Sequence, residues 1–226
     1  FLLLLPGGDR REGLAEMLRA RTQGRLLQGE ADYQLHIIYL WYENQTERAL
    51  DLLRDLRKRH SGNPLFLTQI AEIQDVYQHD VMASLDSWRV LLAEARADRV
   101  NAADLAEVRA RLGLARHLDA LALTDEAIYH LERVIEMEPL APHASLALAY
   151  LRLGEAHDRL NERANATAAY HSDSRLAPTH DPFNIRRQAA ERLRKTPDPQ
   201  HGNAFRLSLK GWRELEQKDV VAAATS

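Results

Sequence analysis

Residues 147 to 178, which read ALAYLRLGEAHDRLNERANATAAYHSDSRLAP, decide the fold. Aromatic and small residues recur there at fixed intervals: Tyr150, then Gly154 four residues later, then Ala166 after a further twelve. Four residues make about one helical turn, so the first two lie on one helix face and the third falls in the following helix. Small side chains at the last two places allow two antiparallel helices to approach closely. The stretch therefore predicts a helical hairpin.

The same spacing of four and twelve occurs three more times, in the sets Tyr33, Ile37, Ala49; Arg111, Ala115, Ala127; and Leu207, Gly211, Ala223. Thr46 and Thr124 each stand three residues before the small residue of a second helix, where a hydroxyl can accept backbone N–H bonds, so they are predicted N-caps. The chain also carries three prolines that disfavour helix at the preceding residue and predict helix ends: Pro64, Pro139 and Pro178. A recurring helical hairpin predicts a repeat array.

Composition points to an all-α fold. Leu and Ala number 37 and 33, whereas Val, Ile and Thr together number 23, so helix formers are favoured over the β-branched residues that suit strands. Asn101 is a predicted N-cap, with Asp104 in the first turn opposing the helix dipole. Periodicity and caps predict helices near residues 10–21, 30–43, 46–60, 64–79, 81–96, 102–120, 124–137, 142–160, 162–176, 183–194 and 202–217.

Charge and cysteine content narrow the functional classes. The formal net charge is -3, which argues against a dedicated binder of nucleic acid or anionic membranes. The absence of Cys excludes disulfides and cysteine metal sites, but it is compatible with either cytosol or periplasm and leaves the localisation open. The longest apolar run, Phe1 to Leu5, falls far short of the roughly 20 residues of a membrane helix, so no span is expected. Because residue 1 is not Met, residues 1–29 are expected to be the remnant of a preceding element plus one helix.

The repeated hairpin resembles the tetratricopeptide repeat (TPR) family. Tyr150, Leu153-Gly154, Ala166, Tyr170 and Pro178 occupy that family's aromatic, Leu-Gly, Ala, aromatic and terminal Pro positions, although His157 replaces the usual Tyr and Asp173 the usual Ala. The phrases at 39–43 and 62–66 further resemble bacterial TPR-containing proteins of unassigned function. The resemblance implies an α-α superhelix, a right-handed solenoid of tandem hairpins. Its repeats would span about 30–64, 65–97, 102–139, 142–178 and an irregular, truncated 183–226, all in a single solenoid domain over 30–226.

A solenoid of this kind implies binding on its concave face, because stacked hairpins form a long concave surface. We therefore expect a non-catalytic interaction module or scaffold whose partner is an unidentified protein or peptide. The family's geometry would point these first-helix residues inward: Gln34, Ile38, Trp41, Tyr42, Asp75, Gln78, Arg116, Asp119, Glu155, Asp158, Arg159 and Trp212. The competing interpretation is that Trp41 and Tyr42 are packing residues and that the charged members are merely solvated.

The family's clamp for a terminal carboxylate uses Lys and Asn at set first-helix positions. The equivalent places hold other residues here, namely Gln34 and Ile38, Leu112 and Arg116, and Leu151 and Glu155. The resemblance therefore does not extend to that clamp.

Two other interaction roles stay open. The last repeat stops at Ser226, before its second helix can complete the core, so its edge could drive homo-oligomer formation. Five basic residues between 186 and 195 could contact phosphate, although cations in a last helical turn also complement the helix dipole.

No sequence motif indicates catalysis. The ten histidines include no His-Glu-x-x-His run, and Pro6-Gly-Gly-Asp9 lacks the ending of a phosphate-binding loop. No catalytic, metal or cofactor residue is predicted, and nucleic acid is not the expected partner.

Overall fold

The computed structural model describes residues 9–24, 27–176, 181, 183–195, 204, 205, 207 and 208, and at 173–176 it describes the backbone alone. These residues form α-helices and connecting turns and contain no strand. The helices are α1 (Arg10–Gln23), α2 (Gln28–Trp41), α3 (Thr46–Arg59), α4 (Pro64–Val76), α5 (Val81–Arg96), α6 (Ala103–Ala120), α7 (Thr124–Met137), α8 (Ser145–Arg159), α9 (Arg163–Leu176) and α10 (Ile185–Arg194). The all-α prediction is confirmed. Residues 204, 205, 207 and 208 are helical, while the rest of the helix expected at 202–217 lies outside the described residues.

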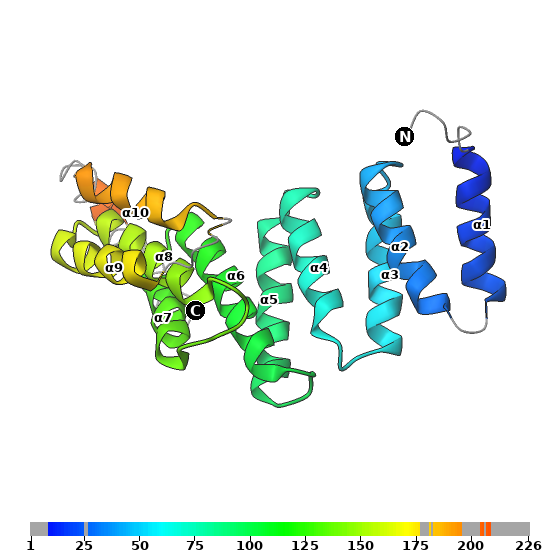
Figure 1. Ribbon diagram of the computed structural model, residues 1–226, viewed down its shortest axis with the longest axis horizontal. Coiled ribbons are helices and arrows are strands. Elements are labelled where there is room, and N and C mark those ends of the chain that lie inside the picture. Colours follow the sequence, from blue (N-terminus) through cyan, green and yellow to red (C-terminus); the bar gives the residue numbers. More distant parts are fainter. Residues whose placement is uncertain are drawn as a thin grey trace, which may run out of the picture. The chain divides into compact units, whose positions relative to one another are not determined.

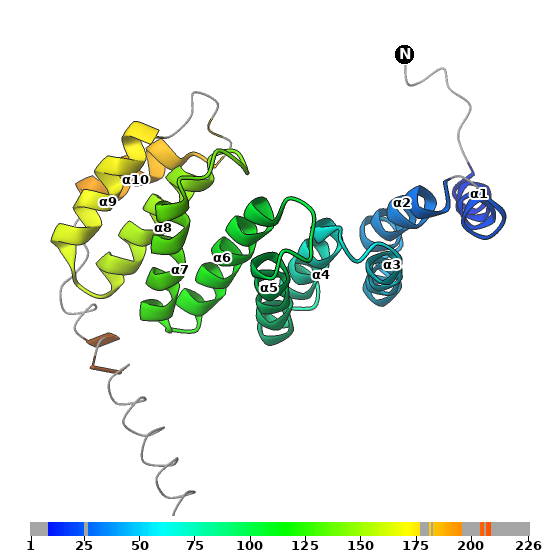
Figure 2. The same cartoon turned by 90° about the horizontal axis from the view of Figure 1, so that it is seen from below.

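Contacts between helices run mainly from each helix to its neighbour in sequence (Figures 1 and 2). Thus α2 packs on α3, α4 on α5 and α8 on α9, while α10 also reaches back to α8. Ten helices packed in this way within the described residues are consistent with a helical repeat array. The chain forms two compact units, divided between Ala103 and Asp104, which we call unit 1 and unit 2.

The core of unit 1 lies between α2, α3 and α4. Leu35, Leu50 and Leu53 have no exposed surface, and Ala49, the predicted small residue of this hairpin, is equally buried. Helix α1 contributes only partly buried residues to this core, through Leu14, Met17 and Leu18. The apolar contact of α1 is therefore shallow.

A buried carboxylate joins three helices of unit 1. Asp32 on α2 is almost fully buried, and Arg21 from α1 lies 2.6 Å from it through Nε. Arg59 from α3 binds its other oxygen. Two guanidinium groups thus neutralise one buried charge, which compensates its desolvation.

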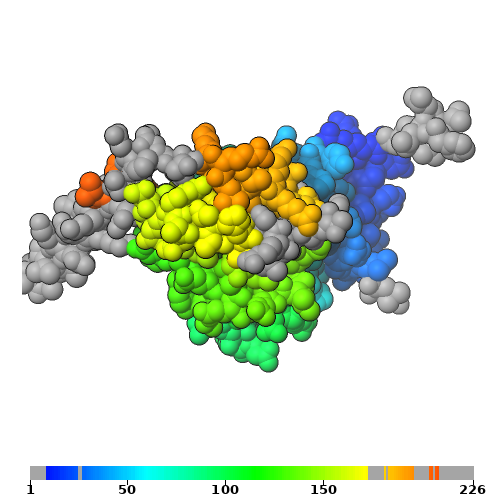
Figure 3. Space-filling view, turned by 60° about the vertical axis from the view of Figure 1, so that its left-hand side comes forward, coloured from blue at the N-terminus to red at the C-terminus, as the bar shows by residue number. Residues whose placement is uncertain are grey.

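In unit 2, α8 and α9 approach each other closely at a glycine. A Cβ placed on Gly154 would lie 2.7 Å from Cδ1 and 2.8 Å from Cζ of Tyr170, whose ring is fully buried. Ala166 is also fully buried, and Ile185 and Ala189 of α10 complete this core. In Figure 3, α9 and α10 lie side by side in yellow and orange. The prediction that small residues sit where two helices meet is confirmed here.

The predicted threonine N-caps are wrong. Thr46 and Thr124 are the first residues of α3 and α7, and the capping positions belong to Gln45 and Leu123, whose side chains make no cap hydrogen bond. A residue with positive φ precedes each cap, Asn44 at 51° and Ala122 at 62°, and turns the chain into the second helix. The cap therefore falls one residue earlier than the hydroxyl.

The other helix-end signals agree better with the structure. Asn63 caps α4, its side chain accepting from the Leu65 amide, and Pro64 follows as the first helical residue. Pro139 comes directly after the C-cap of α7, and Asp104 lies in the first turn of α6. The prediction that Asn101 is an N-cap is wrong, because α6 begins two residues later at Ala103; the backbone N–H of Asn101 instead donates to the Gly62 carbonyl at 2.7 Å. Pro178 lies outside the described residues.

Candidate functional site

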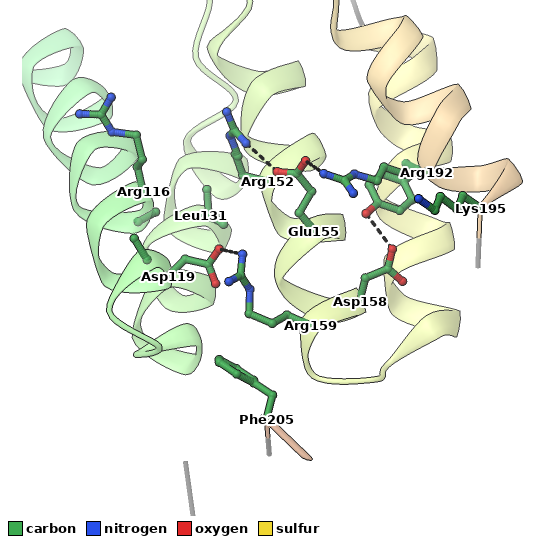
Figure 4. A pocket seen from close by; sticks show the side chains of 13 residues that line it. Arg116, Asp119, Leu131, Arg152, Glu155, Asp158, Arg159, Arg192, Lys195 and Phe205 are labelled. Carbon is green, nitrogen blue, oxygen red and sulfur yellow. Dashed lines mark hydrogen bonds and ion pairs between the residues drawn. The ribbon is translucent and has the colours of Figure 1, made fainter. Parts of the chain in front are cut away.

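Unit 2 contains a groove of about 740 Å³, which we call the unit 2 groove (Figure 4). Residues three, four or seven apart lie on one face of a helix, so Arg152, Glu155 and Arg159 all face it from α8. The lining residues are Ala115, Arg116, Asp119 and Ala120 of α6, Leu131 of α7, Arg152, Glu155, Asp158 and Arg159 of α8, Tyr170 of α9, Arg192 of α10, and Lys195 and Phe205.

Glu155 is held between two arginines. Arg152 Nη1 lies 2.7 Å from one of its carboxylate oxygens, and Arg192 Nη2 lies 3.1 Å from the other. The Glu155 side chain is 12% exposed, whereas those of Arg152 and Arg192 are 46% and 55% exposed. Each guanidinium carries five N–H donors in a rigid fork, so both can bind a second acceptor while they hold Glu155.

A second ion pair crosses the groove from α8 to α6. Arg159 Nη2 lies 2.8 Å from Asp119, and the Thr124 hydroxyl donates to the other oxygen of that carboxylate at 3.1 Å. The Arg159 guanidinium also lies over the Phe205 ring, 5.8 Å from its centroid. A cation at that distance is attracted to the face of the ring. Arg159 is therefore fixed by an anion on one side and an aromatic ring on the other (Figure 4).

Asp158 belongs to the packing between α8 and α9. It is 9% exposed, accepts a hydrogen bond from the Tyr170 hydroxyl at 2.9 Å, and receives Arg163 Nη1 at 2.9 Å on both oxygens. Burial, followed by the bond to Asp158, raises the pKa of Tyr170 well above its usual value. Arg163 donates further to the Arg192 carbonyl at 2.9 Å. The Asp158 network therefore also fixes the end of α10, from which Arg192 reaches Glu155.

Basic residues outnumber acidic ones in the groove. Its lining includes five cations, Arg116, Arg152, Arg159, Arg192 and Lys195, against the three carboxylates of Asp119, Glu155 and Asp158. One of those carboxylates is also neutralised by Arg163, which does not line the groove. Apolar side chains lie among the charges, namely Ala115, Ala120, Leu131 and Phe205. The groove thus combines a positive excess with an apolar surface.

The structure brings together five of the residues that the sequence predicted for a concave face. Arg116, Asp119, Glu155, Asp158 and Arg159 all line the unit 2 groove. Asp158, however, is buried against Tyr170 and Arg163, which gives it a packing role in addition. Their part in binding stays a prediction.

The remaining predicted residues lie in unit 1 or outside the described part. Trp41 and Tyr42, at the end of α2, are 63% and 66% exposed, so their interpretation as packing residues is wrong. Gln34 is exposed and donates to Glu30 at 2.8 Å, Ile38 and Asp75 are half-buried, and Gln78 donates to Glu47. Trp212 lies outside the described residues.

Sequence reasoning missed several members of the groove. Arg152 could have been found, because it precedes Glu155 by three residues on a helix and forms an i, i+3 ion pair with it. Arg192 and Lys195 belong to the basic stretch at 186–195, but their place beside α8 depends on how α10 packs. Leu131, Tyr170 and Phe205 carried no sequence signal for a shared site.

The described residues contain no group of three or more His, Asp or Glu side chains arranged to hold a metal ion. None of their helices has the length and apolar character needed to cross a membrane. Comparison with known protein families finds none that matches the chain, and comparison with curated proteins finds no significant match.

Proposed function

We propose that this chain is a TPR-like interaction module that binds a segment of another protein in the unit 2 groove and does no chemistry on it. The observation that carries the proposal is the groove itself, in which α6 and α8, the first helices of two successive hairpins, present charged side chains beside an apolar surface. The family resemblance supports it independently, through the spacing of Tyr150, Gly154 and Ala166. A right-handed superhelix with a concave face is part of this proposal.

The groove is suited to binding because its walls are already ordered. Arg159 is fixed by Asp119 and Phe205, and the end of α10 is fixed by Arg163. Side chains that are held in place before binding lose less conformational entropy when a ligand arrives. A segment of a partner protein can therefore gain affinity from several modest contacts along the groove.

A pull-down with a charge-reversed groove tests the proposal. The double variant Arg116→Glu with Glu155→Arg keeps the net charge but inverts the pattern of the groove, and we expect it to lose most of the partner recovered by the wild-type chain. The matched control is Asp86→Arg with Arg89→Glu, an exposed ion pair on α5 in unit 1. Far-UV circular dichroism establishes that both variants remain folded. Equal recovery by both variants would place the binding surface elsewhere and overturn the proposal.

A further inference from the structure

We infer that the unit 2 groove selects an acidic peptide segment, and that Glu155 competes with the carboxylates of that segment for Arg152 and Arg192. This inference rests on the proposed function and names the class of partner. Its basis is charge complementarity, since five cations line the groove against three carboxylates.

The available cations surround Glu155. Arg152 and Arg192 are about half exposed while they hold Glu155, so part of each guanidinium faces solvent. Lys195 is exposed and lines the same groove. Planar guanidinium groups bind carboxylates through paired N–H donors, and such charge-assisted bonds are about twice as strong as neutral ones. An incoming carboxylate therefore meets donors that Glu155 does not saturate.

The carboxylate of Glu155 has two opposing effects on an acidic ligand. It keeps Arg152 and Arg192 together, which pre-organises the donors, but it also repels a second carboxylate at the same place. Glutamine at this position keeps the length and a hydrogen-bond acceptor but removes the negative charge. The substitution Glu155→Gln should therefore strengthen the binding of an acidic ligand, whereas a groove for basic ligands would lose affinity.

A peptide fits the groove better than a nucleic acid strand. Asp119 and Glu155 repel phosphates and carboxylates alike, so the choice between the two ligands depends on the uncharged surface of the groove. Of the two aromatic side chains in the lining, Tyr170 is fully buried against Gly154, which leaves Phe205 for stacking with bases. Ala120 is an exposed apolar residue of the same lining and suits an aliphatic side chain. The segment we infer alternates acidic and aliphatic residues.

Fluorescence anisotropy on the full chain tests this inference. The probes are fluorescein-labelled decapeptides with alternating Glu and Leu, their Gln-Leu and Lys-Leu counterparts, and a single-stranded DNA of ten nucleotides. We expect the Glu-Leu peptide to bind at least about tenfold more tightly than its counterparts, with affinity falling as salt rises.

Variants assign the effect to the groove. Arg152→Gln and Arg192→Gln should each weaken binding of the Glu-Leu peptide by about tenfold, the range for one lost charged hydrogen bond. Glu155→Gln should strengthen it by about threefold, as expected for one removed charge under partial screening. The matched control is Arg187→Gln, which removes the same charge from the same helix as Arg192 at a position outside the groove. It should change the affinity by less than about twofold.

The outcomes separate this inference from the proposed function. Preference for the Gln-Leu or Lys-Leu peptide, with sensitivity to Arg152→Gln, overturns the acidic partner but keeps a peptide-binding groove. Tighter binding of the DNA through the same arginines overturns both in favour of nucleic acid. Binding of no probe above background overturns the inference and removes the support that the groove gives to the proposed function. Glu-Leu binding that is unchanged by Arg152→Gln and Arg192→Gln also overturns the inference.

Discussion

Replacing Gly154 with alanine should destabilise unit 2, although alanine is normally the better helix former. The new Cβ would lie 2.7 Å and 2.8 Å from two ring carbons of Tyr170 and closer still to Cε1, whereas ordinary contacts are 3.4–4 Å. The ring cannot turn aside easily, because it is fully buried and its hydroxyl donates to Asp158. The strain must therefore be relieved by moving α9 away from α8.

The expected change in the free energy of unfolding follows from two opposing effects. Overpacking a close-packed core costs about 1–3 kcal/mol, and a clash with three atoms of one immobile ring belongs at the upper end of that range. The higher helix propensity of alanine stabilises the folded state by about 1 kcal/mol. The free energy of unfolding should thus fall by about 2 kcal/mol, which lowers the ratio of folded to unfolded protein by a factor of about thirty.

Urea unfolding followed by circular dichroism measures this change. The matched control is Gly13→Ala on α1, where nothing lies within 4 Å of the added Cβ, and which should leave stability unchanged or raise it by up to about 1 kcal/mol. In a Tyr170→Ala background, Gly154→Ala should not lower the free energy of unfolding, because the ring that would clash with the new Cβ is absent. A stabilising Gly154→Ala, or an equal loss in both backgrounds, would refute the reasoning.

Three further predictions concern buried ionisable groups. Burial lowers the pKa of His36, and hydrogen bonds to Tyr33 and Gln69 oppose this shift. As pH falls, the unfolded chain therefore takes up this proton before the folded chain does. The free energy of unfolding should fall as pH drops below about 6.5, by up to about 1.4 kcal/mol per pH unit. Denaturant midpoints from pH 7.5 to 5.5 should show a flatter dependence in His36→Gln. Asp32→Asn should lower the free energy of unfolding by about 2 kcal/mol in urea at pH 7, since it removes the charge that two arginines bind, and an unchanged midpoint would contradict this. Tyr170 has a raised pKa, so the unfolded chain loses that proton first and stability should decline as pH rises above about 10, less steeply in Tyr170→Phe.

The fold could be predicted from sequence because hairpin packing depends on residue size at a few places. Ala49, Ala127 and Ala166 were expected where two helices meet, and each has no exposed surface. Arg111 shows the limit of such reasoning. It replaces the aromatic residue of the repeat yet is 3% exposed, and Glu107 neutralises it at 2.6 Å from one turn earlier. Size and pairing together make an arginine acceptable at a core position.

The helix starts were harder to predict because backbone geometry decides them. In four hairpins, a non-glycine residue with positive φ stands two places before the second helix: Asn44, His79, Ala122 and Asn161. Asparagine and histidine are both enriched in that conformation and give a readable signal, whereas Ala122 does not. The turn therefore places Gln45 and Leu123 at the N-cap positions, which the sequence had assigned to the threonines one residue later.

The candidate site was only half visible in the sequence, because sequence spacing places residues on a helix but does not place one helix against another. Arg116, Asp119 and Glu155 could be assigned to a shared face from the geometry of the repeats that the sequence resembles. Arg192 could not, since it reaches Glu155 across 37 positions through the packing of α10 on α8 and α9. Phe205 meets Arg159 in the same long-range way.

Helix α8 links the stability of unit 2 to the shape of its groove. One face carries Gly154 and Asp158 against α9, and the adjoining face carries Arg152 and Glu155 toward the ligand space. Arg163, bound to Asp158, also holds the last carbonyls of α10, from which Arg192 extends. A displacement of α9 that relieves a clash at Gly154 would move Arg163 and, through its bond to the Arg192 carbonyl, the end of α10. The ion pair between Arg192 and Glu155 would then weaken. The close packing at Gly154 therefore supports the position of Arg192 beside Glu155, on which the proposed recognition of an acidic segment depends.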